Sequence, residues 1–229
     1  MKESLRLHSE ERRQAIVEAV KGVFAEKGFD GTTTRELAKA AGVSEALLYK
    51  HFPSKESLYA AMLDDCIKGA SWVEFNRIMA LEPSTSTLVI MVHFLISYFL
   101  LGSSRDANNS VKDRLILRSL LEDGEFARLA LKHFAEAWIG KFEECLKAAA
   151  KAGELREIPV RPDLRAWFAH HLAASLKLHL HPKVPTIDYK ATKETLVEQG
   201  VWFALLGAGL KDEAIKHYYN PKAMALLAG

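Results

Sequence analysis

The chain has 229 residues, of which 49% are hydrophobic and 26% charged, and its formal net charge is +2. This length allows one large domain or two small ones, and the composition is that of an ordinary globular protein. The whole positive excess lies in residues 1–55, with ten Lys/Arg against eight Asp/Glu, so an anionic partner is expected there. A random scatter of charges over a solvated surface explains so small an excess equally well.

Several classes of protein are excluded by these features. The first residues, MKESLRLHSEERRQ, contain no apolar segment, so no signal peptide is expected. The most apolar run, residues 88–101, is 14 residues long, whereas a bilayer span needs roughly 20. Cys66 and Cys145 show neither a metal-ligand spacing nor a disulfide framework. We therefore expect a cytoplasmic protein that does not enter a membrane.

Nearly the whole chain shows the periodicity of amphipathic helices, and no segment has strand character. Helix starts are indicated by capping residues: Ser9, Ser44, Ser54, and Thr33 followed by Glu36 as a capping box. The sequence thus predicts an all-α fold. Helices are expected over residues 9–27, 34–41, 45–51, 54–80, 86–101 (apolar on all sides), 111–121, 125–151, 163–180 and 192–210, with loops at 103–110 and 181–189.

Two of these helices, over 34–41 and 45–51, are separated by the short turn Ala-Gly-Val-Ser. Two short helices joined by a glycine turn form a helix-turn-helix, whose second helix can enter the major groove of DNA. Apolar residues such as Leu37 and Leu48 would hold the two helices together. The residues then left to point outward are Glu45, Ala46, Leu47 and Lys50.

Polar groups around this pair suit the phosphate backbone of DNA. Hydroxyl, imidazole and ammonium donors are carried by Ser44, Tyr49, His51 and Lys55. The helix starts at Thr33 and Ser54 also favour anions, through free N–H groups and the helix dipole. However, any short helices need such caps, and Tyr49 could cover the core. Spacing alone therefore leaves DNA binding and a plain helical core equally open.

The run GFDGTTTRELAKAAGVSEALLYKHFPSKESLY over residues 28–59 closely resembles the signature of the TetR family of bacterial transcriptional regulators. The matching elements are Gly28-Phe29, Thr32-Thr33, Leu37-Ala38, Ala41-Gly42-Val43-Ser44, Leu48-Tyr49, His51-Phe52 and Lys55-Glu56. The resemblance implies an N-terminal three-helix DNA-binding domain over residues 1–53. It also implies a C-terminal helical ligand-binding and dimerisation domain over residues 54–229.

The resemblance also implies roles for individual residues and a way of working. Phosphate contacts would come from Thr33, Tyr49, His51 and Lys55. Residues at or near base edges would be Arg35, Ser44, Glu45, Ala46 and Lys50, and Leu47 would offer only an apolar contact, such as one to a thymine methyl. The protein would be a homodimer that represses transcription at a palindromic operator in double-stranded DNA. A small-molecule effector would release it.

The resemblance also implies that the last two long helices pair with those of a second subunit in a four-helix bundle. Small residues permit such close approach of helices, and the sequence has them at Ala169, Ala173, Ala174, Gly200, Ala204 and Gly207. Plain packing within one chain would use the same residues, so this alternative stays open.

In the architecture that the resemblance implies, a ligand would lie among the helices at 86–101, 111–121 and 125–151. The candidate residues on the first of these are His93, Phe94, Ser97 and Tyr98, and those on the last are Phe134, Trp138 and Phe142. Such stripes are more often core than pocket, but buried polar groups need partners. An aromatic lining with few charges favours an apolar or aromatic effector.

Other kinds of function find little support. The late histidines His170, His171, His179 and His181 lack the spacing and companion ligands of a metal site, so we expect no metal and no cofactor. No P-loop, Rossmann, GxSxG or HExxH motif occurs, so we expect no catalytic residues and no enzyme. The main alternative is a DNA-bound architectural or protein-interaction factor without a small-molecule effector.

Overall fold

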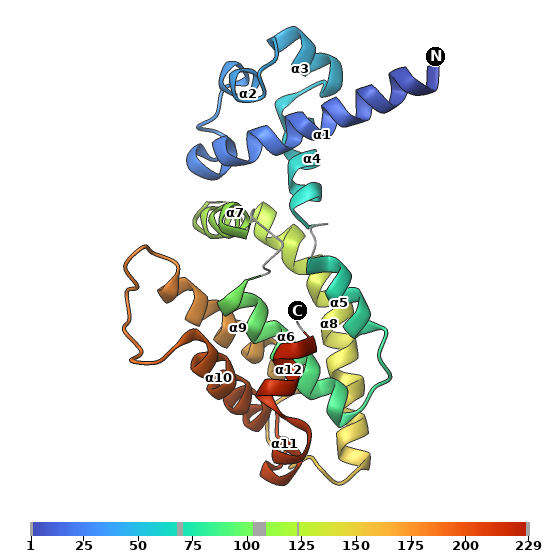
Figure 1. Ribbon diagram of the computed structural model, residues 1–229, viewed down its shortest axis with the longest axis vertical. Coiled ribbons are helices and arrows are strands. Elements are labelled where there is room, and N and C mark those ends of the chain that lie inside the picture. Colours follow the sequence, from blue (N-terminus) through green and yellow to red (C-terminus); the bar gives the residue numbers. More distant parts are fainter. Residues whose placement is uncertain (1, 68–70, 103–108, 123, 228–229) are drawn as a thin grey trace. The chain divides into compact units, whose positions relative to one another are not determined.

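Figure 1 shows the computed structural model, which describes residues 2–67, 71–102, 109–122 and 124–227. Within these ranges the elements are all helices, and the one β-type pairing is an isolated bridge between Leu155 and Leu210. The all-α prediction is confirmed. The helices are α1 (Lys2–Lys27), α2 (Thr34–Ala40), α3 (Glu45–His51), α4 (Lys55–Ile67), α5 (Ser71–Met79), α6 (Thr85–Leu101), α7 (Asn109–Leu121), α8 (Glu125–Lys151), α9 (Pro162–Leu180), α10 (Lys193–Gly207), α11 (Asp212–Tyr218) and α12 (Pro221–Leu227).

The boundaries of two predicted helices differ from the structure near the N-terminus. Helix α1 begins at Lys2, so the prediction that Ser9 starts it is wrong. The residues before Ser9 are mostly Lys, Glu, Leu and Arg, which are strong helix formers and extend the helix upstream. The single helix predicted over 54–80 corresponds to α4 and α5, and residues 68–70 between them lie outside the described residues.

Further differences lie later in the chain. Of the predicted loop at 103–110, residues 103–108 are not described, and α7 already begins at Asn109. Helix α10 ends at Gly207, three residues before the predicted end, because Gly209 takes a left-handed backbone with a φ of 96°. Helices α11 and α12 follow it and were not predicted.

The chain forms two compact units. One unit, the N-terminal unit, consists of Met1–Trp72 and Arg105–Lys132, and the other, the C-terminal unit, consists of Val73–Ser104 and His133–Gly229. Helix α4, α7 and the start of α8 therefore belong to the same unit as the first three helices. The boundaries of these compact units differ from the domain boundary predicted between residues 53 and 54.

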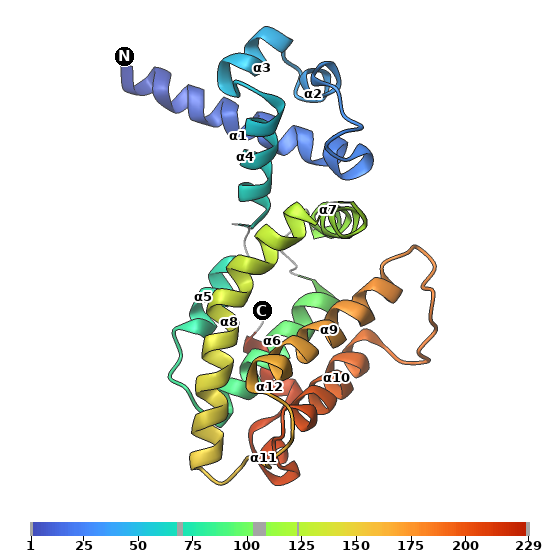
Figure 2. The same ribbon diagram turned by 180° about the vertical axis from the view of Figure 1, so that it is seen from behind.

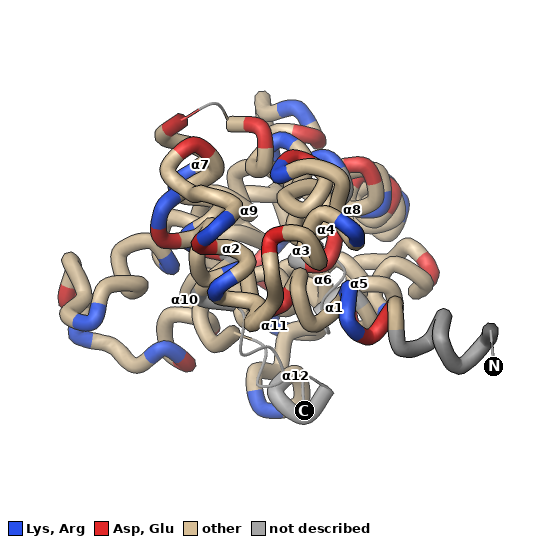
Figure 3. The backbone as a smooth tube through the Cα atoms, turned by 90° about the horizontal axis from the view of Figure 1, so that it is seen from above, with Lys and Arg blue, Asp and Glu red and all other residues tan. Residues whose placement is uncertain are grey.

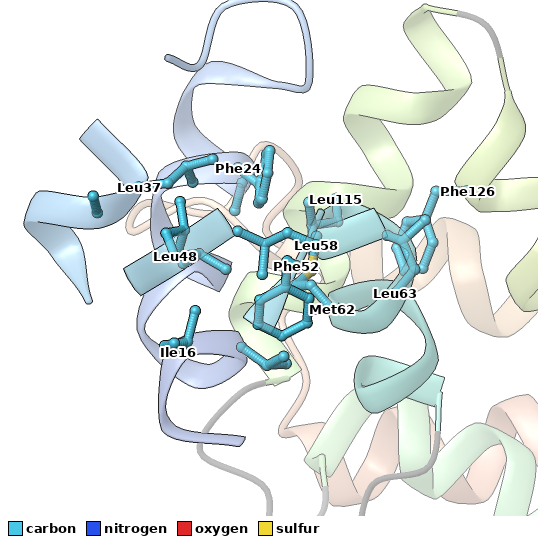
Figure 4. Packing of buried hydrophobic residues seen from close by; sticks show 14 residues of the cluster. Ile16, Phe24, Leu37, Leu48, Phe52, Leu58, Met62, Leu63, Leu115 and Phe126 are labelled. Carbon is cyan, nitrogen blue, oxygen red and sulfur yellow. The ribbon is translucent and has the colours of Figure 1, made fainter. Parts of the chain in front are cut away.

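The N-terminal unit has one continuous hydrophobic core (Figure 4). Residues from α1 to α4 supply most of it, including Phe24, Leu37, Leu48 and Phe52, all at most 2% exposed. Leu115 of α7 and Phe126 of α8 complete the core from a distant part of the sequence. Helix α1 packs against α2, α4 and α7, while α2 packs against α3.

Helix α6 forms the centre of the C-terminal unit and packs against α9, α10 and α11. Helices α9 and α10 run side by side in both views (Figures 1 and 2). Most residues of α6 are buried, among them Leu88, Val92 and Ile96. Ile90, Phe94 and Tyr98 on another face are only half-buried, so the burial on every side that the apolar sequence predicted is incomplete. In the part of the chain that is described, no helix is both long and apolar enough to cross a bilayer.

Candidate functional site

The start of α2 is fixed by a capping box between Thr33 and Glu36. The Thr33 hydroxyl accepts a 3.3 Å hydrogen bond from the Glu36 N–H, and the Glu36 carboxylate accepts a 2.9 Å bond from the Thr33 N–H. Hydrogen bonds to the carboxylate, first from Lys27 and then from Thr33, lower the pKa of Glu36 from 4.5 to about 2. The predicted capping box is confirmed.

Helix α3 presents one face to the core and the other to the outside. Leu48 is 2% exposed and packs in the core of the N-terminal unit, and the Ser44 hydroxyl caps the helix by accepting a 3.2 Å hydrogen bond from the Leu47 N–H. The outward residues are largely accessible: Ser44, Glu45, Ala46, Tyr49 and Lys50 are exposed, while Leu47 and His51 are half-buried. The residues expected to meet DNA are thus on the accessible side of α3.

Two side chains from other helices hold the ends of α3. At its start, the Thr34 hydroxyl of α2 donates a 3.1 Å hydrogen bond to the Glu45 carboxylate. At its end, the Arg13 guanidinium of α1 donates a 2.7 Å hydrogen bond to the His51 carbonyl and lies 4.1 Å from the centre of the Phe52 ring. Neither contact was predicted. The sequence did indicate that Arg13 lies on the inner face of its helix, because it stands three residues before Ile16, which is buried.

The remaining predicted DNA contacts differ in their surroundings. Thr33 and Arg35 are exposed near the start of α2. Lys55 is half-buried, and its ammonium donates hydrogen bonds of 2.8 and 3.0 Å to the carbonyls of Phe29 and Thr32. Helices α1 to α4 carry both Lys/Arg and Asp/Glu (Figure 3), so any attraction for DNA comes from local placement of cations and not from a uniformly basic face.

The candidate effector residues of α6 divide into two groups. His93 and Ser97 are each 8% exposed, and the His93 ring lies between the Ser97 hydroxyl at 3.3 Å and the Tyr219 hydroxyl at 3.5 Å. Burial lowers the pKa of His93 from 6.5. Phe94 and Tyr98 form the other group, with their rings stacked at a centroid distance of 6.1 Å. The partner of His93 at Tyr219 was missed because it follows α11, which was not predicted.

The candidate residues of α8 make further contacts of their own. Trp138 is 1% exposed and stacks on Phe75 of α5 at 6.3 Å, and Phe142 is completely buried. The side chain of Phe134 lies outside the described residues. The structure therefore confirms that the described members of both stripes are at least partly buried. His93 contacts the Tyr219 hydroxyl, the Tyr98 ring stacks on Phe94, and the Trp138 ring stacks on Phe75.

Most small residues of α9 and α10 lie on a different face from the large exposed apolar residues, whereas Gly207 is exposed. Ala169, Ala173 and Ala204 are buried inside the unit, and a Cβ atom at Gly200 would lie 3.4 Å from Ile96 of α6. These small residues serve packing within the chain. The outward face instead shows large apolar side chains: Phe168 (56% exposed), Leu178 (47%), Phe203 (69%) and Leu206 (39%).

Comparison with known proteins agrees with this architecture. Residues 16–62 match the model of the bacterial regulatory proteins of the tetR family. The HTH-type transcriptional repressor KstR2 of Rhodococcus jostii is 31% identical over 151 residues, which are 63% of this chain and 68% of that protein. The nucleoid occlusion factor SlmA of Vibrio campbellii is 38% identical over 89 residues, which are 38% of this chain and 45% of that protein.

A solved structure shares the fold over most of the chain. This is AibR in complex with isovaleryl coenzyme A and operator DNA, with a TM-score of 0.60 and 21% identity, covering 84% of this chain and 97% of that one. This chain belongs to the TetR family of DNA-binding transcriptional regulators, and not to a family of enzymes.

Proposed function

We propose that this protein is a ligand-responsive repressor that binds a palindromic operator as a homodimer and is released by a small, largely apolar or aromatic effector. It works in the cytoplasm, and residues before 54 supply most of the DNA contacts. The observation that carries the proposal is the outward face of α3, where Ser44, Glu45, Ala46 and Lys50 are exposed while Leu48 anchors the helix in the core.

The DNA contacts divide by the chemistry of the side chains. Thr33, Tyr49 and His51 carry donors suited to phosphate oxygens, and such contacts fix the position of a protein without reading sequence. The residues proposed to face base edges are Arg35 of α2, Ser44 at the start of α3, and Glu45, Ala46, Leu47 and Lys50 within α3. Lys55 supports DNA binding mainly by holding the turn before α2 through its hydrogen bonds to Phe29 and Thr32. Its third ammonium N–H is proposed to donate to a phosphate.

The proposed dimer is formed by α9 and α10. Phe168 and Phe203 are 56% and 69% exposed, and Leu178 and Leu206 extend the same kind of surface. Large apolar side chains gathered on two adjacent helices are typical of a protein interface. A second copy of the chain would bury these side chains, and the two DNA-binding domains of the dimer would then read two half-sites.

The proposed effector binds within the C-terminal unit, beside α6 and α8. The polar pair His93 and Ser97, with the Tyr219 hydroxyl beside it, lies on a largely apolar helix, so these groups could orient a ligand whose remainder is apolar. The AibR structure contains isovaleryl coenzyme A, in which a short apolar acyl group is attached to a large polar carrier. A short-chain acyl compound is therefore among the effectors to be tested first.

A second candidate function is favoured by one observation. SlmA, with which this chain shares 38% identity over 89 residues, is named a nucleoid occlusion factor. A DNA-bound protein-interaction factor without a small-molecule effector would have the same DNA-binding domain and form the same dimer. The two functions differ in whether a small molecule changes DNA binding.

The experiment that separates them is a screen of aromatic and short-chain acyl compounds, including isovaleryl coenzyme A, against the full chain. The proposal predicts that at least one compound raises the melting temperature and weakens operator binding, because a ligand shifts an equilibrium only through different affinities for its two states. If every compound that raises the melting temperature leaves operator binding unchanged, or none raises it, the second candidate is favoured.

A further inference from the structure

Arg13 lies in α1, outside the helix-turn-helix, yet it contacts the end of the recognition helix α3. Its guanidinium donates a 2.7 Å hydrogen bond to the carbonyl of His51, the last residue of α3. The same group lies 4.1 Å from the centre of the Phe52 ring, and Phe52 is 1% exposed in the core. Arg13 thus contacts both the helix end and the residue that anchors it.

The end of α3 needs a donor from elsewhere. The last carbonyls of an α-helix have no partner within the helix, and residues just beyond the end often supply N–H groups for them. Here Phe52 donates to the Leu48 carbonyl, Pro53 has no N–H, and the Ser54 N–H donates to the Ser57 hydroxyl. The His51 carbonyl therefore receives its hydrogen bond from Arg13 instead of from the following chain.

The position of α3 is sensitive to such a contact. The helix has only seven residues, and a helix this short has little stability of its own. Leu48 and Phe52 fix it in the core, Thr34 holds its start through Glu45, and Arg13 holds its end. The cation also interacts favourably with the negative end of the helix dipole and with the aromatic ring.

We propose that Arg13 is a positioning residue for sequence recognition: it sets the orientation of α3 in the major groove without itself reading a base. This rests on the proposed use of α3 to read an operator. Hydrogen bonds to base edges depend on the exact placement of the helix, whereas binding to phosphates tolerates small shifts. Loss of Arg13 should therefore lower the preference for the operator over random DNA, and not only the affinity for DNA.

The competing explanation is that Arg13 meets a phosphate directly. Removal of a phosphate contact weakens operator and random DNA by similar factors and makes the salt dependence less steep by about one unit. Arg12 offers a matched control because it is the neighbouring residue, is exposed, and carries the same charge. Both Arg12→Ala and Arg13→Ala remove one positive charge from the same helix.

The experiment uses the full chain and an operator selected with the wild-type protein from a random DNA pool. Affinities for the operator and for random DNA of equal length are measured at several salt concentrations for the wild type, Arg12→Ala, Arg13→Ala and Arg13→Lys. The ratio of the two affinities does not depend on the fraction of folded protein, so partial unfolding of a variant cannot imitate the effect.

We expect Arg13→Ala to lower the operator-to-random ratio by about tenfold, the size of one lost charge-assisted hydrogen bond, and Arg12→Ala to leave the ratio near the wild-type value. Arg13→Lys, which keeps a charged donor, should restore part of the ratio. An unchanged ratio in Arg13→Ala, with both affinities reduced equally, would overturn the inference and assign Arg13 to a phosphate. If the wild type selects no sequence at all, the proposed function itself fails, and this inference fails with it.

Discussion

Lys55 and Phe29 connect the start of α4 to the turn between α1 and α2. The Lys55 ammonium donates a 2.8 Å hydrogen bond to the Phe29 carbonyl and lies 4.1 Å from the centre of the Phe29 ring. A second hydrogen bond of 3.0 Å joins it to the Thr32 carbonyl. The residue that the TetR resemblance assigned to a phosphate is thus also a structural support for the start of α2.

Replacement of Lys55 by Ala should therefore have two effects. Loss of the two hydrogen bonds should lower the free energy of unfolding by about 1–3 kcal/mol. Loss of the remaining donor should weaken operator and random DNA alike, and the slope of log K against log salt should decrease by about one unit. Chemical denaturation and DNA titrations at several salt concentrations measure these effects. Lys39→Ala, an exposed position on α2, is the control for stability. A change in which DNA sequence is preferred would contradict this assignment.

Much of the N-terminal unit was predictable from sequence because its signals are local. Thr33 with Glu36, and Ser44 with the Leu47 N–H, are caps whose partners lie three residues away. By contrast, Leu115 and Phe126 complete the same core from residues far along the chain, and no local pattern indicates such a contact. Arg13 was missed for a similar reason, since its partner His51 is 38 residues away.

In the C-terminal unit, the resemblance to the family predicted the helices but not the contacts of individual residues. The apolar sequence of α6 correctly predicted that most of this helix is buried, although Phe94 and Tyr98 on one face are only half-buried. For the small residues of α9 and α10 the sequence left a dimer contact and packing within one chain both open, and Ala173 and Gly200 pack inside the chain. A sequence shows that a residue is small, but not which of two helix faces it occupies.

His170 of α9 should make stability depend on pH. Burial, with the nearby His171 as a smaller cause, lowers the pKa of His170 from 6.5 to about 4. Between these two values the unfolded chain binds more protons than the folded one, so stability should fall as the pH decreases from 6.5 toward 4. Above pH 6.5 both states are neutral at this residue, and the effect should vanish.

Melting temperatures measured from pH 7.5 to pH 4 test this prediction. His170→Phe should flatten the curve, since a phenyl ring can keep the edge contacts with Phe99 and Trp167 without titrating. His217→Gln, at an exposed position of α11, is the control and should leave the slope unchanged. The interpretation fails if His170→Phe retains the full wild-type slope.

Phe203 should be essential for the dimer. It is 69% exposed in the single chain, so a carboxylate at this position would be solvated in the monomer but would have to be buried in the interface. Phe203→Glu should therefore give a folded monomer in sedimentation equilibrium at micromolar concentration, whereas the wild type should be a dimer. Val73→Glu introduces the same charge at a site on α5 that is 58% exposed, and this variant should remain dimeric. A monomeric wild type would refute the proposed interface.

Ser97 should separate effector binding from DNA binding. The residue is 8% exposed and lies 3.3 Å from the His93 ring, so the larger side chain of Ser97→Phe would crowd this polar pair at a cost of about 1–3 kcal/mol. We expect the variant to lose its response to any effector that the screen identifies, while the operator affinity of the free protein stays within about tenfold, because Ser97 belongs to a different compact unit from the proposed DNA contacts. Ser97→Ala, which adds no volume but removes the hydroxyl, should weaken the response without abolishing it. A full response from Ser97→Phe would place the effector elsewhere.

The central claim is that two copies of α3 read two half-sites of one operator. It is tested most directly by selecting binding sites from a random DNA pool with the full-length wild-type chain. The number of chains bound to the selected site is then determined. Two recognition helices related by a two-fold axis reach successive major grooves about 34 Å apart, or a multiple of that distance. The account predicts an enriched inverted repeat with this spacing, bound by an even number of chains. Enrichment of a single unrepeated site bound by one chain, or of no sequence, would contradict it.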